Sequence, residues 1–174
     1  AVWTLLLMLA ALGWVLFAAP RSWALAAGGL AGAAALYGAV MGLEFALMQR
    51  INRSDPAPRA RAAQVLRAWW AEVVVALRVF CWDQPFRSRA HADWLPPAPT
   101  GQRGVVLVHG FLCNRGLWNP WFARLRARGH AYVAVNLEPV FGSIDDYVPA
   151  LEAAVQRVQA ATGVPPVLIC HSMG

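Results

Sequence analysis

Two long apolar runs near the beginning of the chain constrain its structure most strongly. Residues 2–19 contain no charged side chain, and residues 23–48 contain none before Glu44. An α-helix rises about 1.5 Å per residue, so each run is close to the length that crosses the hydrocarbon core of a bilayer. The sequence Pro-Arg-Ser at residues 20–22 interrupts the two runs and predicts a turn. We therefore expect a transmembrane helical hairpin over residues 1–49.

The first apolar run has an alternative interpretation as a cleaved signal peptide. No positively charged segment precedes it, and a second apolar run follows at once, so we favour retention in the membrane. Small residues four positions apart, Gly28 with Gly32 and Gly38 with Gly42, would let two helices approach closely. We expect both pairs of glycines to lie at helix–helix contacts.

All 15 basic residues are arginines, and about half of them follow the second apolar run. Eight arginines lie between Arg50 and Arg89, against three acidic residues in the same stretch. A basic collar beside a bilayer suits anionic lipid headgroups better than a nucleic-acid backbone, so we expect no nucleic-acid partner. A solvated basic linker is the alternative. Five arginines within residues 50–67, against Arg21 alone in the hairpin turn, place the C-terminal part in the cytoplasm.

Residues 50–102 are predicted to be a juxtamembrane linker that contains one helix. Residues 52–58 are rich in helix-breaking residues. From residue 62 to residue 80 apolar side chains recur at helical spacing, which predicts an amphipathic helix that ends before Pro85. Residues 60–82 could lie in the bilayer interface or could cap an active site, and the sequence leaves both open.

Beyond Gly104 the pattern of apolar residues changes from helical runs to short strands. Three strand-like runs alternate with two helical patterns, and these lie at residues 105–108, 117–128, 132–135, 143–163 and 167–170. Strands alternating with helices through short loops predict a mostly parallel sheet with helices on both faces. We therefore expect an α/β domain over residues 103–174.

The segment Cys170-His171-Ser172-Met173-Gly174 follows the third predicted strand and nearly spells G-x-S-x-G. That motif holds a serine on a sharp, strained turn, so its flanking positions require small residues. Gly174 satisfies one position, whereas Cys170 replaces the other glycine and leaves the tightness of the turn open. Ser172 is the candidate nucleophile, and the backbone N–H of Met173 is a candidate donor to an oxyanion.

A second motif, His109-Gly110-Phe111, follows the first predicted strand. Both motifs emerge at the carboxyl ends of parallel strands, where such sheets place their ligands. Gly110 would allow a close approach of the backbone, and the N–H of Phe111 would be the second oxyanion donor. We expect His109 to organise this loop rather than to act as the general base, and His171 to have a structural role.

These two motifs together resemble the α/β-hydrolase family, especially its bacterial lipase and esterase branch. The resemblance covers about residues 104–174. It implies the N-terminal part of an α/β-hydrolase fold and ester cleavage through an acyl-enzyme on Ser172, without a metal or another cofactor. In that family the acid and the histidine of the triad follow the nucleophile. We expect both beyond Gly174, so that the segment would be truncated after the elbow and inactive by itself.

The combined prediction is a membrane-anchored serine hydrolase of the bacterial inner membrane, with its hydrolase domain in the cytoplasm. Its expected partners are the lipid bilayer and an ester or acyl-lipid substrate. A thioesterase or an acyltransferase on the same fold is the first alternative, and a non-catalytic hydrolase-like binding domain is the second. Cys81, Cys113 and Cys170 show no metal-ligand or C-x-x-C spacing, so they predict neither a metal site nor a disulfide framework.

Overall fold

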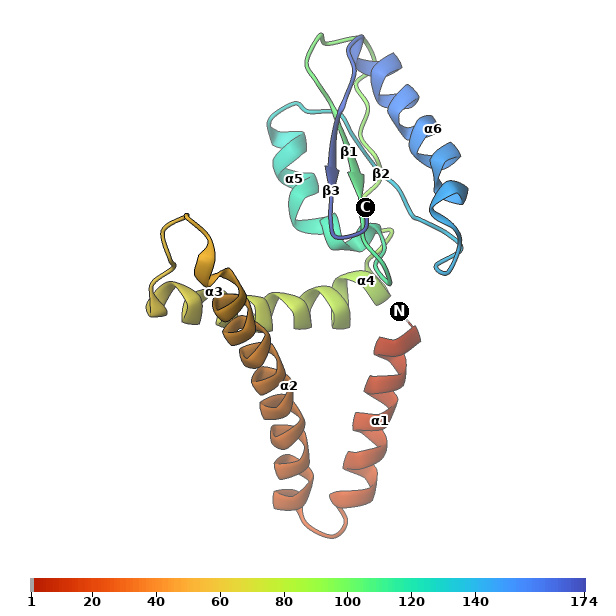
Figure 1. The fold of residues 1–174 in the computed structure, drawn as a ribbon. Helices are drawn as coiled ribbons and strands as arrows, with labels where there is room; N and C mark the ends of the chain where they lie inside the picture. The colour runs from red at the N-terminus through yellow and green to blue at the C-terminus, as the bar shows by residue number, and fades with distance from the viewer. Residues whose placement is uncertain (1) are drawn as a thin grey trace. The chain divides into compact units, whose positions relative to one another are not determined.

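The computed structural model describes residues 2–174, apart from the side chain of Trp3. The chain divides into two compact units, a helical unit up to Cys81 and a sheet unit from Trp82 to Gly174 (Figure 1). The finer division predicted from the sequence, with boundaries after residues 49 and 102, stays a prediction.

The helical unit begins with two packed antiparallel helices, as the apolar runs predicted. Its elements are α1 (Val2–Ala18), α2 (Trp23–Ile51), a 3₁₀ turn (Asn52–Ser54) and α3 (Ala62–Arg78). The side chain of Ser22 caps α2 by accepting a hydrogen bond from the N–H of Leu25. Of the helices described, only the one that extends from Trp23 to Ser54 is long and apolar enough to cross a membrane, judged by length and composition. The expectation of two spanning helices is therefore supported for α2 alone.

Glycines do lie at helix–helix contacts in this unit, but only one of the two predicted glycine pairs does so. A Cβ atom on Gly38 would lie 3.5 Å from the ring of Trp69 in α3, and one on Gly42 would lie 3.6 Å from its Nε1. The indole Nε1–H of Trp69 donates to the Gly38 carbonyl at 3.0 Å. The predicted pair Gly38 and Gly42 therefore makes the contact between α2 and α3.

The contact between α1 and α2 uses other residues. Gly29 lies against the ring of Trp14, which leaves no room for a Cβ atom, and Trp14 Nε1 donates to the Ala26 carbonyl at 3.1 Å. Gly28 and Gly32 face open space, so the prediction that they form a helix contact is wrong. The spacing of Gly28 and Gly32 indicated the correct helix, α2, but the glycine that contacts α1 is the neighbouring Gly29.

Helical structure continues beyond the end of α3. α3 runs into a π-helical turn (Val79–Asp83) and then, in the sheet unit, into the short helix α4 (Gln84–Phe86). Pro85 lies in the first turn of α4, where a missing N–H removes no helical hydrogen bond. α3 itself therefore ends at Arg78, before Pro85 as predicted, and what the sequence did not predict is the further helical turn that contains Pro85.

The sheet unit is a parallel sheet covered on both faces, which confirms the predicted α/β fold. Strands β1 (Val105–Val108), β2 (Tyr132–Ala134) and β3 (Val167–Cys170) lie in the order β2-β1-β3. A 3₁₀ turn (Arg115–Trp118) leads into α5 (Asn119–Ala127), and α6 (Ile144–Thr162) connects β2 to β3. α5 and α6 lie on opposite sides of the sheet (Figure 1).

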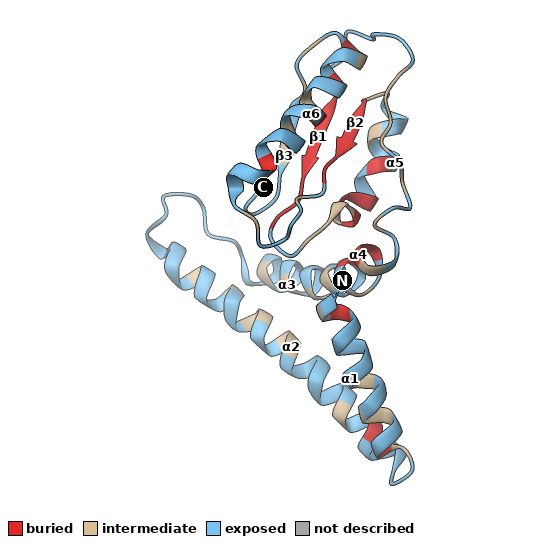
Figure 2. Ribbon diagram, turned by 90° about the vertical axis from the view of Figure 1, so that its right-hand side faces the viewer, coloured by how far each residue is buried: buried red, intermediate tan, exposed pale blue. Residues whose placement is uncertain are grey.

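The central strand β1 explains why its sequence is a continuous apolar run. Val106 and Val108 pack with Val158 of α6, whereas Leu107 packs with Phe122 of α5. All residues of β1 are buried, as its red colour in Figure 2 shows. A parallel strand buried on both faces needs apolar residues at every position rather than at alternate ones.

The predicted linker before β1 contributes to this sheet. Trp94 pairs with Tyr132 as an antiparallel bridge, through hydrogen bonds of 3.0 Å and 2.8 Å between their backbone N–H and C=O groups. Trp94 also packs against the apolar cluster on the α5 side of the sheet. Part of the predicted linker at residues 50–102 is thus a structural component of the sheet unit.

Candidate active site

The predicted elbow forms a tight turn directly after β3. Ser172 has a φ of 57°, in the left-handed region that residues other than glycine rarely adopt. The N–H of Gly174 donates to the His171 carbonyl at 3.0 Å and closes the turn, while the N–H of His171 donates to the Val108 carbonyl at 3.0 Å. A strained serine at a strand end is the backbone geometry that a nucleophile elbow requires.

Two glycines allow this turn to press against the end of β1. A Cβ atom on Gly110 would lie 2.8 Å from both the His171 carbonyl oxygen and Ser172 Cβ. A Cβ atom on Gly174 would lie 2.8 Å from the Val108 carbonyl oxygen. Neither position has room for a side chain. The structure thus brings the two motifs into direct contact.

Cys170, which replaces the expected first glycine of the motif, causes no such conflict. It ends β3 in register with Val108, and its side chain is exposed. The turn after it still reaches the left-handed conformation at Ser172. The departure from the family pattern therefore leaves the tight turn intact.

His109 is buried and uses both ring nitrogens within the protein. Its Nε2 accepts a hydrogen bond from the N–H of Leu137 at 3.1 Å, so Nδ1 carries the proton and donates to the Gly110 carbonyl at 2.8 Å. Burial lowers the pKa of His109 below its ordinary value and favours the neutral ring. This arrangement ties the loop after β1 to the loop after β2 and leaves neither nitrogen for Ser172.

The two predicted oxyanion donors lie on the loops that meet here. Within the described residues, the backbone N–H groups of Phe111 and Met173 donate to no protein acceptor. Both residues line the same cavity, which has a volume of about 260 Å³. These two N–H groups therefore remain available to a bound oxygen atom.

Most of the cavity wall is apolar and comes from the loop after β1, the loop before α6 and α6 itself. The lining residues are Val108, His109, Gly110, Phe111, Leu112, Cys113, Leu137, Val140, Ile144, Tyr147, Val148, Leu151, Met173 and Gly174. Sequence reasoning missed the contribution of α6, because apolar residues spaced by three and four positions are typical of any helix packed on a core. The hydroxyl of Tyr147 donates to the Pro139 carbonyl at 2.7 Å, which fixes the loop beside the cavity.

The residues after the oxyanion loop divide between the cavity and the turn. Cys113 lines the cavity, and burial raises the pKa of its thiol. Asn114 shapes the turn, since its Oδ1 accepts from the N–H of Gly116 at 2.9 Å. Trp118 is buried in the core and Trp121 is exposed, and neither lines the cavity.

A buried polar pair from the segment before β1 holds this turn in place. The N–H of Asn114 donates to Gln84 Oε1 at 2.9 Å, and its Nδ2 donates to the Gln84 carbonyl at 3.0 Å. Asn119 Nδ2 donates to Asp83 Oδ1 at 3.2 Å. Sequence reasoning missed Asp83 and Gln84, because contacts across about thirty residues leave no local pattern.

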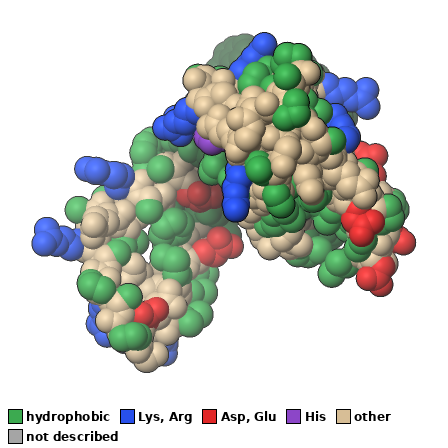
Figure 3. Space-filling model, turned by 90° about the horizontal axis from the view of Figure 1, so that it is seen from above, with side chains coloured by type: hydrophobic (Ala, Val, Ile, Leu, Met, Phe, Trp, Pro, Cys, Tyr) green, Lys and Arg blue, Asp and Glu red, His purple; other side chains and the backbone are tan. Residues whose placement is uncertain are grey.

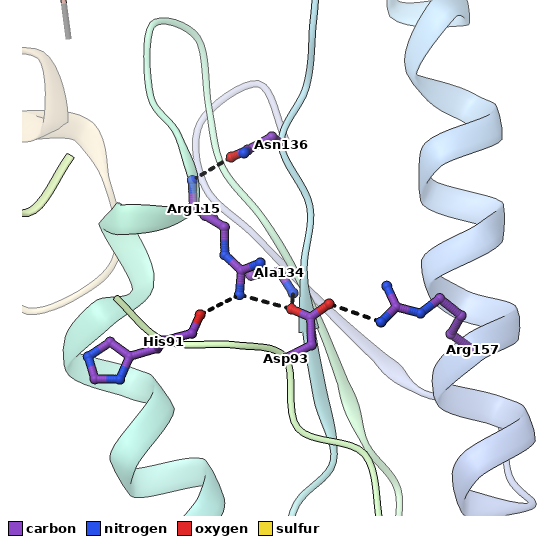
Figure 4. Close-up of polar contacts among 6 residues, drawn as sticks. All are labelled: His91, Asp93, Arg115, Ala134, Asn136 and Arg157. Carbon is purple, nitrogen blue, oxygen red and sulfur yellow. Dashed lines mark hydrogen bonds and ion pairs between the residues drawn. The ribbon is translucent and has the colours of Figure 1, made fainter. Parts of the chain in front are cut away.

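Asp93 anchors the same region from the other side. Its Oδ1 lies 2.9 Å from Arg115 Nη2 and accepts from the N–H of Ala134 at 3.2 Å, while its Oδ2 lies 3.1 Å from Arg157 Nη2 (Figure 4). The N–H of Arg115 donates in turn to Asn136 Oδ1 at 2.9 Å. One carboxylate therefore links the turn after β1, strand β2 and helix α6.

The side chains of Ser143 and Asp146 cap the start of α6. The N–H of Ser143 donates to Asp146 Oδ2 at 2.8 Å, and the N–H of Asp145 donates to Ser143 Oγ at 3.3 Å.

Among residues 2–174, no group of three or more His, Cys, Asp or Glu side chains lies close enough to hold a metal ion.

Comparison with known proteins identifies the same part of the chain. A model of the alpha/beta hydrolase family matches residues 105–174. The match runs from the first residue of β1 to the end of the elbow and so includes both motifs of the site. Comparisons with curated proteins and with solved structures found no match. The sheet, the strained turn and the family match together support a hydrolase-type function for this part of the chain.

Proposed function

We propose that this chain supplies the nucleophile and the oxyanion hole of a serine hydrolase that cleaves carboxylic esters of the lipase or esterase type. The observation that supports this most directly is the left-handed backbone of Ser172, pressed against Gly110 at the end of the central strand. Strain at an exposed serine is retained where the surrounding structure holds it, and such positions concentrate at active sites.

In the proposed reaction the Oγ atom of Ser172 attacks the acyl carbonyl and forms an acyl-enzyme. The N–H groups of Phe111 and Met173 stabilise the oxyanion, because unpaired backbone donors aimed at developing charge lower the barrier. The serine proton passes to a histidine that the family resemblance predicts beyond Gly174, and that histidine returns it to the departing alkoxide. His109 stays neutral and holds the oxyanion loop in place.

The cavity beside the elbow supports an apolar acyl group as the part of the substrate held there. No arginine lines the cavity, and burial favours the neutral form of His109, the only lining residue able to become a cation. A carboxylate or phosphate on the acyl chain would therefore be buried without a partner, which is strongly unfavourable. At about 260 Å³ the cavity is smaller than sites for drug-sized ligands, so we propose one acyl chain as its occupant.

We further propose that α2 anchors the protein in a bacterial inner membrane and that the sheet unit lies in the cytoplasm. The length and apolar composition of α2 support the anchor, and the arginines that follow it support the orientation. A reporter fused after Gly101 is expected to behave as cytoplasmic. Periplasmic activity of that reporter would overturn the orientation.

A fluorophosphonate probe tests the nucleophile in the full-length protein. Ser172→Ala should abolish labelling, because the probe reacts with an activated serine. Ser88→Ala is the matched control: it removes another serine of the same unit that lies outside the cavity lining and should leave labelling unchanged. Labelling that persists in Ser172→Ala would refute the assignment. No labelling of the wild-type protein would instead favour a non-catalytic binding domain.

A further inference from the structure

An apolar groove lies between α2 and α3, within the helical unit and separate from the candidate active site. Its volume is about 690 Å³. The lining residues are Gly42, Phe45, Ala46, Gln49, Ala60, Ala62, Val65, Leu66 and Trp69. Gln49 is the only polar side chain among them besides the indole N–H of Trp69, and that N–H is already bound to Gly38. The groove therefore suits a hydrocarbon chain.

A smaller polar hollow adjoins one end of this groove. Its volume is about 220 Å³, and it shares Gln49 and Ala60 with the groove. The hollow is also lined by the polar or charged residues Asn52, Asp55 and Arg59 and by Met48, Ala57 and Pro58, so its lining is mixed but more polar than that of the groove. The two cavities together offer an apolar space that continues into a polar one, which is the chemistry of a lipid with one acyl chain and its headgroup.

The charge around the hollow favours an anionic headgroup. Arg59 and Asp55 line the hollow itself, and the exposed arginines Arg50, Arg53 and Arg61 lie next to these residues in the chain. Arg59 Nη2 donates to the Arg53 carbonyl at 2.8 Å, and Asp55 Oδ1 accepts from the N–H of Ala57 at 2.7 Å. Arginine side chains (blue) stand out from the surface shown in Figure 3. An excess of arginines beside a bilayer attracts anionic lipids.

The groove begins along α2 near the edge of the hydrocarbon core, where the acyl chains of a bilayer meet its headgroups. Gly42 lies about 28 Å along α2 from Trp23, close to the ~30 Å thickness of the hydrocarbon core. α3 also exposes an apolar stripe at helical spacing, formed by Leu66, Trp70, Val74 and Leu77. A helix with such a stripe can lie in the interface with its apolar face among the acyl chains.

From these observations we propose that α2 and α3 form a binding site for one anionic phospholipid. Its acyl chain occupies the apolar groove beside Trp69, and its phosphate group lies in the adjoining hollow beside Arg59. The site holds a lipid of the surrounding membrane rather than the substrate of Ser172. It therefore stands independently of the proposed catalytic function.

Quenching of Trp69 by brominated lipid tests this site in the full-length protein. Phosphatidylcholine nanodiscs would carry a small, equal fraction of either dibrominated phosphatidylglycerol or dibrominated phosphatidylcholine. The contribution of Trp69 is the difference between the wild-type protein and Trp69→Phe. We expect stronger quenching of Trp69 by the brominated phosphatidylglycerol, because the anionic lipid would be enriched in the groove.

Two kinds of variant separate the headgroup from the acyl chain. Arg53→Gln and Arg59→Gln should each weaken the enrichment by up to about fivefold, because a basic residue near a membrane surface contributes about that much to anionic-lipid attraction. Ala46→Leu should reduce quenching by filling the groove without changing charge. Arg124→Gln with Arg126→Gln, on α5 of the sheet unit, is the control and should change nothing.

Several outcomes would overturn the proposal. Equal quenching of Trp69 by the two brominated lipids would refute selection of an anionic headgroup, and no quenching by either would refute an acyl chain in the groove. Native mass spectrometry of the wild-type protein in detergent gives a second measurement that needs no variant. We expect a retained anionic phospholipid, and retention of zwitterionic lipid alone would contradict the proposal.

Discussion

The two units use the same type of residue in opposite ways. Leu107 in the central strand is 0% exposed, whereas Leu36 in α2 is 67% exposed, and Figure 2 shows the same contrast for the elements that contain them. Many other large apolar side chains of α1 and α2 are exposed in the same way. In water, these side chains would forgo the free energy that apolar burial provides. The contrast shows that the sheet unit makes its own core, whereas α1 and α2 leave most of their large apolar side chains exposed, the pattern expected of the proposed anchor.

The largest expected effect separates these two leucines directly. Leu107→Ala should lower the free energy of unfolding of the sheet unit by about 2–5 kcal/mol, because it leaves a cavity between the sheet and α5. Leu36→Ala should change the stability of the protein by no more than about 0.5 kcal/mol, as for other positions outside a packed core. Hydrogen exchange of the β1–β3 peptides in the detergent-solubilised protein measures the first effect. Comparable losses in both variants would contradict the contrast.

A pair of glycines extends the comparison from stability to the site. Gly110→Ala should slow fluorophosphonate labelling by about a hundredfold, since its Cβ would displace Ser172 and small misplacements of reacting groups cost that much. Gly28→Ala, at a position that faces open space, should leave the labelling rate unchanged. The ratio of the two rates is the measurement. A Gly110→Ala protein that labels at the wild-type rate would show that the close approach is not required.

Two neighbouring tryptophans of α3 should also differ, by a smaller amount. Trp69→Phe removes the hydrogen bond to the Gly38 carbonyl, which should cost about 1 kcal/mol of the free energy that docks α3 on α2. Trp70→Phe replaces an indole at a residue that is 61% exposed and should leave the docking of α3 on α2 unchanged. Hydrogen exchange of α3 amides reports the docking. Equal exchange in the two variants would count against the Trp69 contact.

The smallest expected effect concerns the pH dependence of the sheet unit. Because burial lowers the pKa of His109 below 6.5, the unfolded chain takes up a proton at mildly acidic pH that the folded protein does not. The free energy of unfolding should therefore fall as the pH drops below 6.5, and this group adds no dependence well above it. Exchange of the β1–β3 peptides, compared between about pH 5.5 and about pH 8 after correction for intrinsic rates, measures the difference. His130→Gln should keep this dependence and His109→Gln should lose it; the same slope in both would contradict the assignment.

The order of elements could be predicted from the sequence because it depends on local patterns. Apolar runs with different periods distinguished the helical hairpin from the strand–helix alternation. The contacts between elements were less predictable. The spacing of Gly28 and Gly32 suggested a helix contact, but the rotation of α2 against α1 placed Gly29 there instead.

The site divides in the same way. Ser172, Gly110 and Gly174 could be predicted because a strained turn and a close backbone approach restrict which residues fit. The cavity wall from α6 and the contacts of Gln84 and Asp93 could not, because they depend on which side chains the fold brings together across the chain.

The most direct test of the central claim is to trap the acyl-enzyme on the full-length protein. After a short reaction with a p-nitrophenyl ester of an uncharged aliphatic acid and an acid quench, mass spectrometry of the proteolytic peptides locates the acyl group. We expect the added acyl mass on the peptide that contains Ser172, at the strained turn after β3. An acyl group on any other residue, with Ser172 unmodified, would contradict the assignment of Ser172 as the nucleophile.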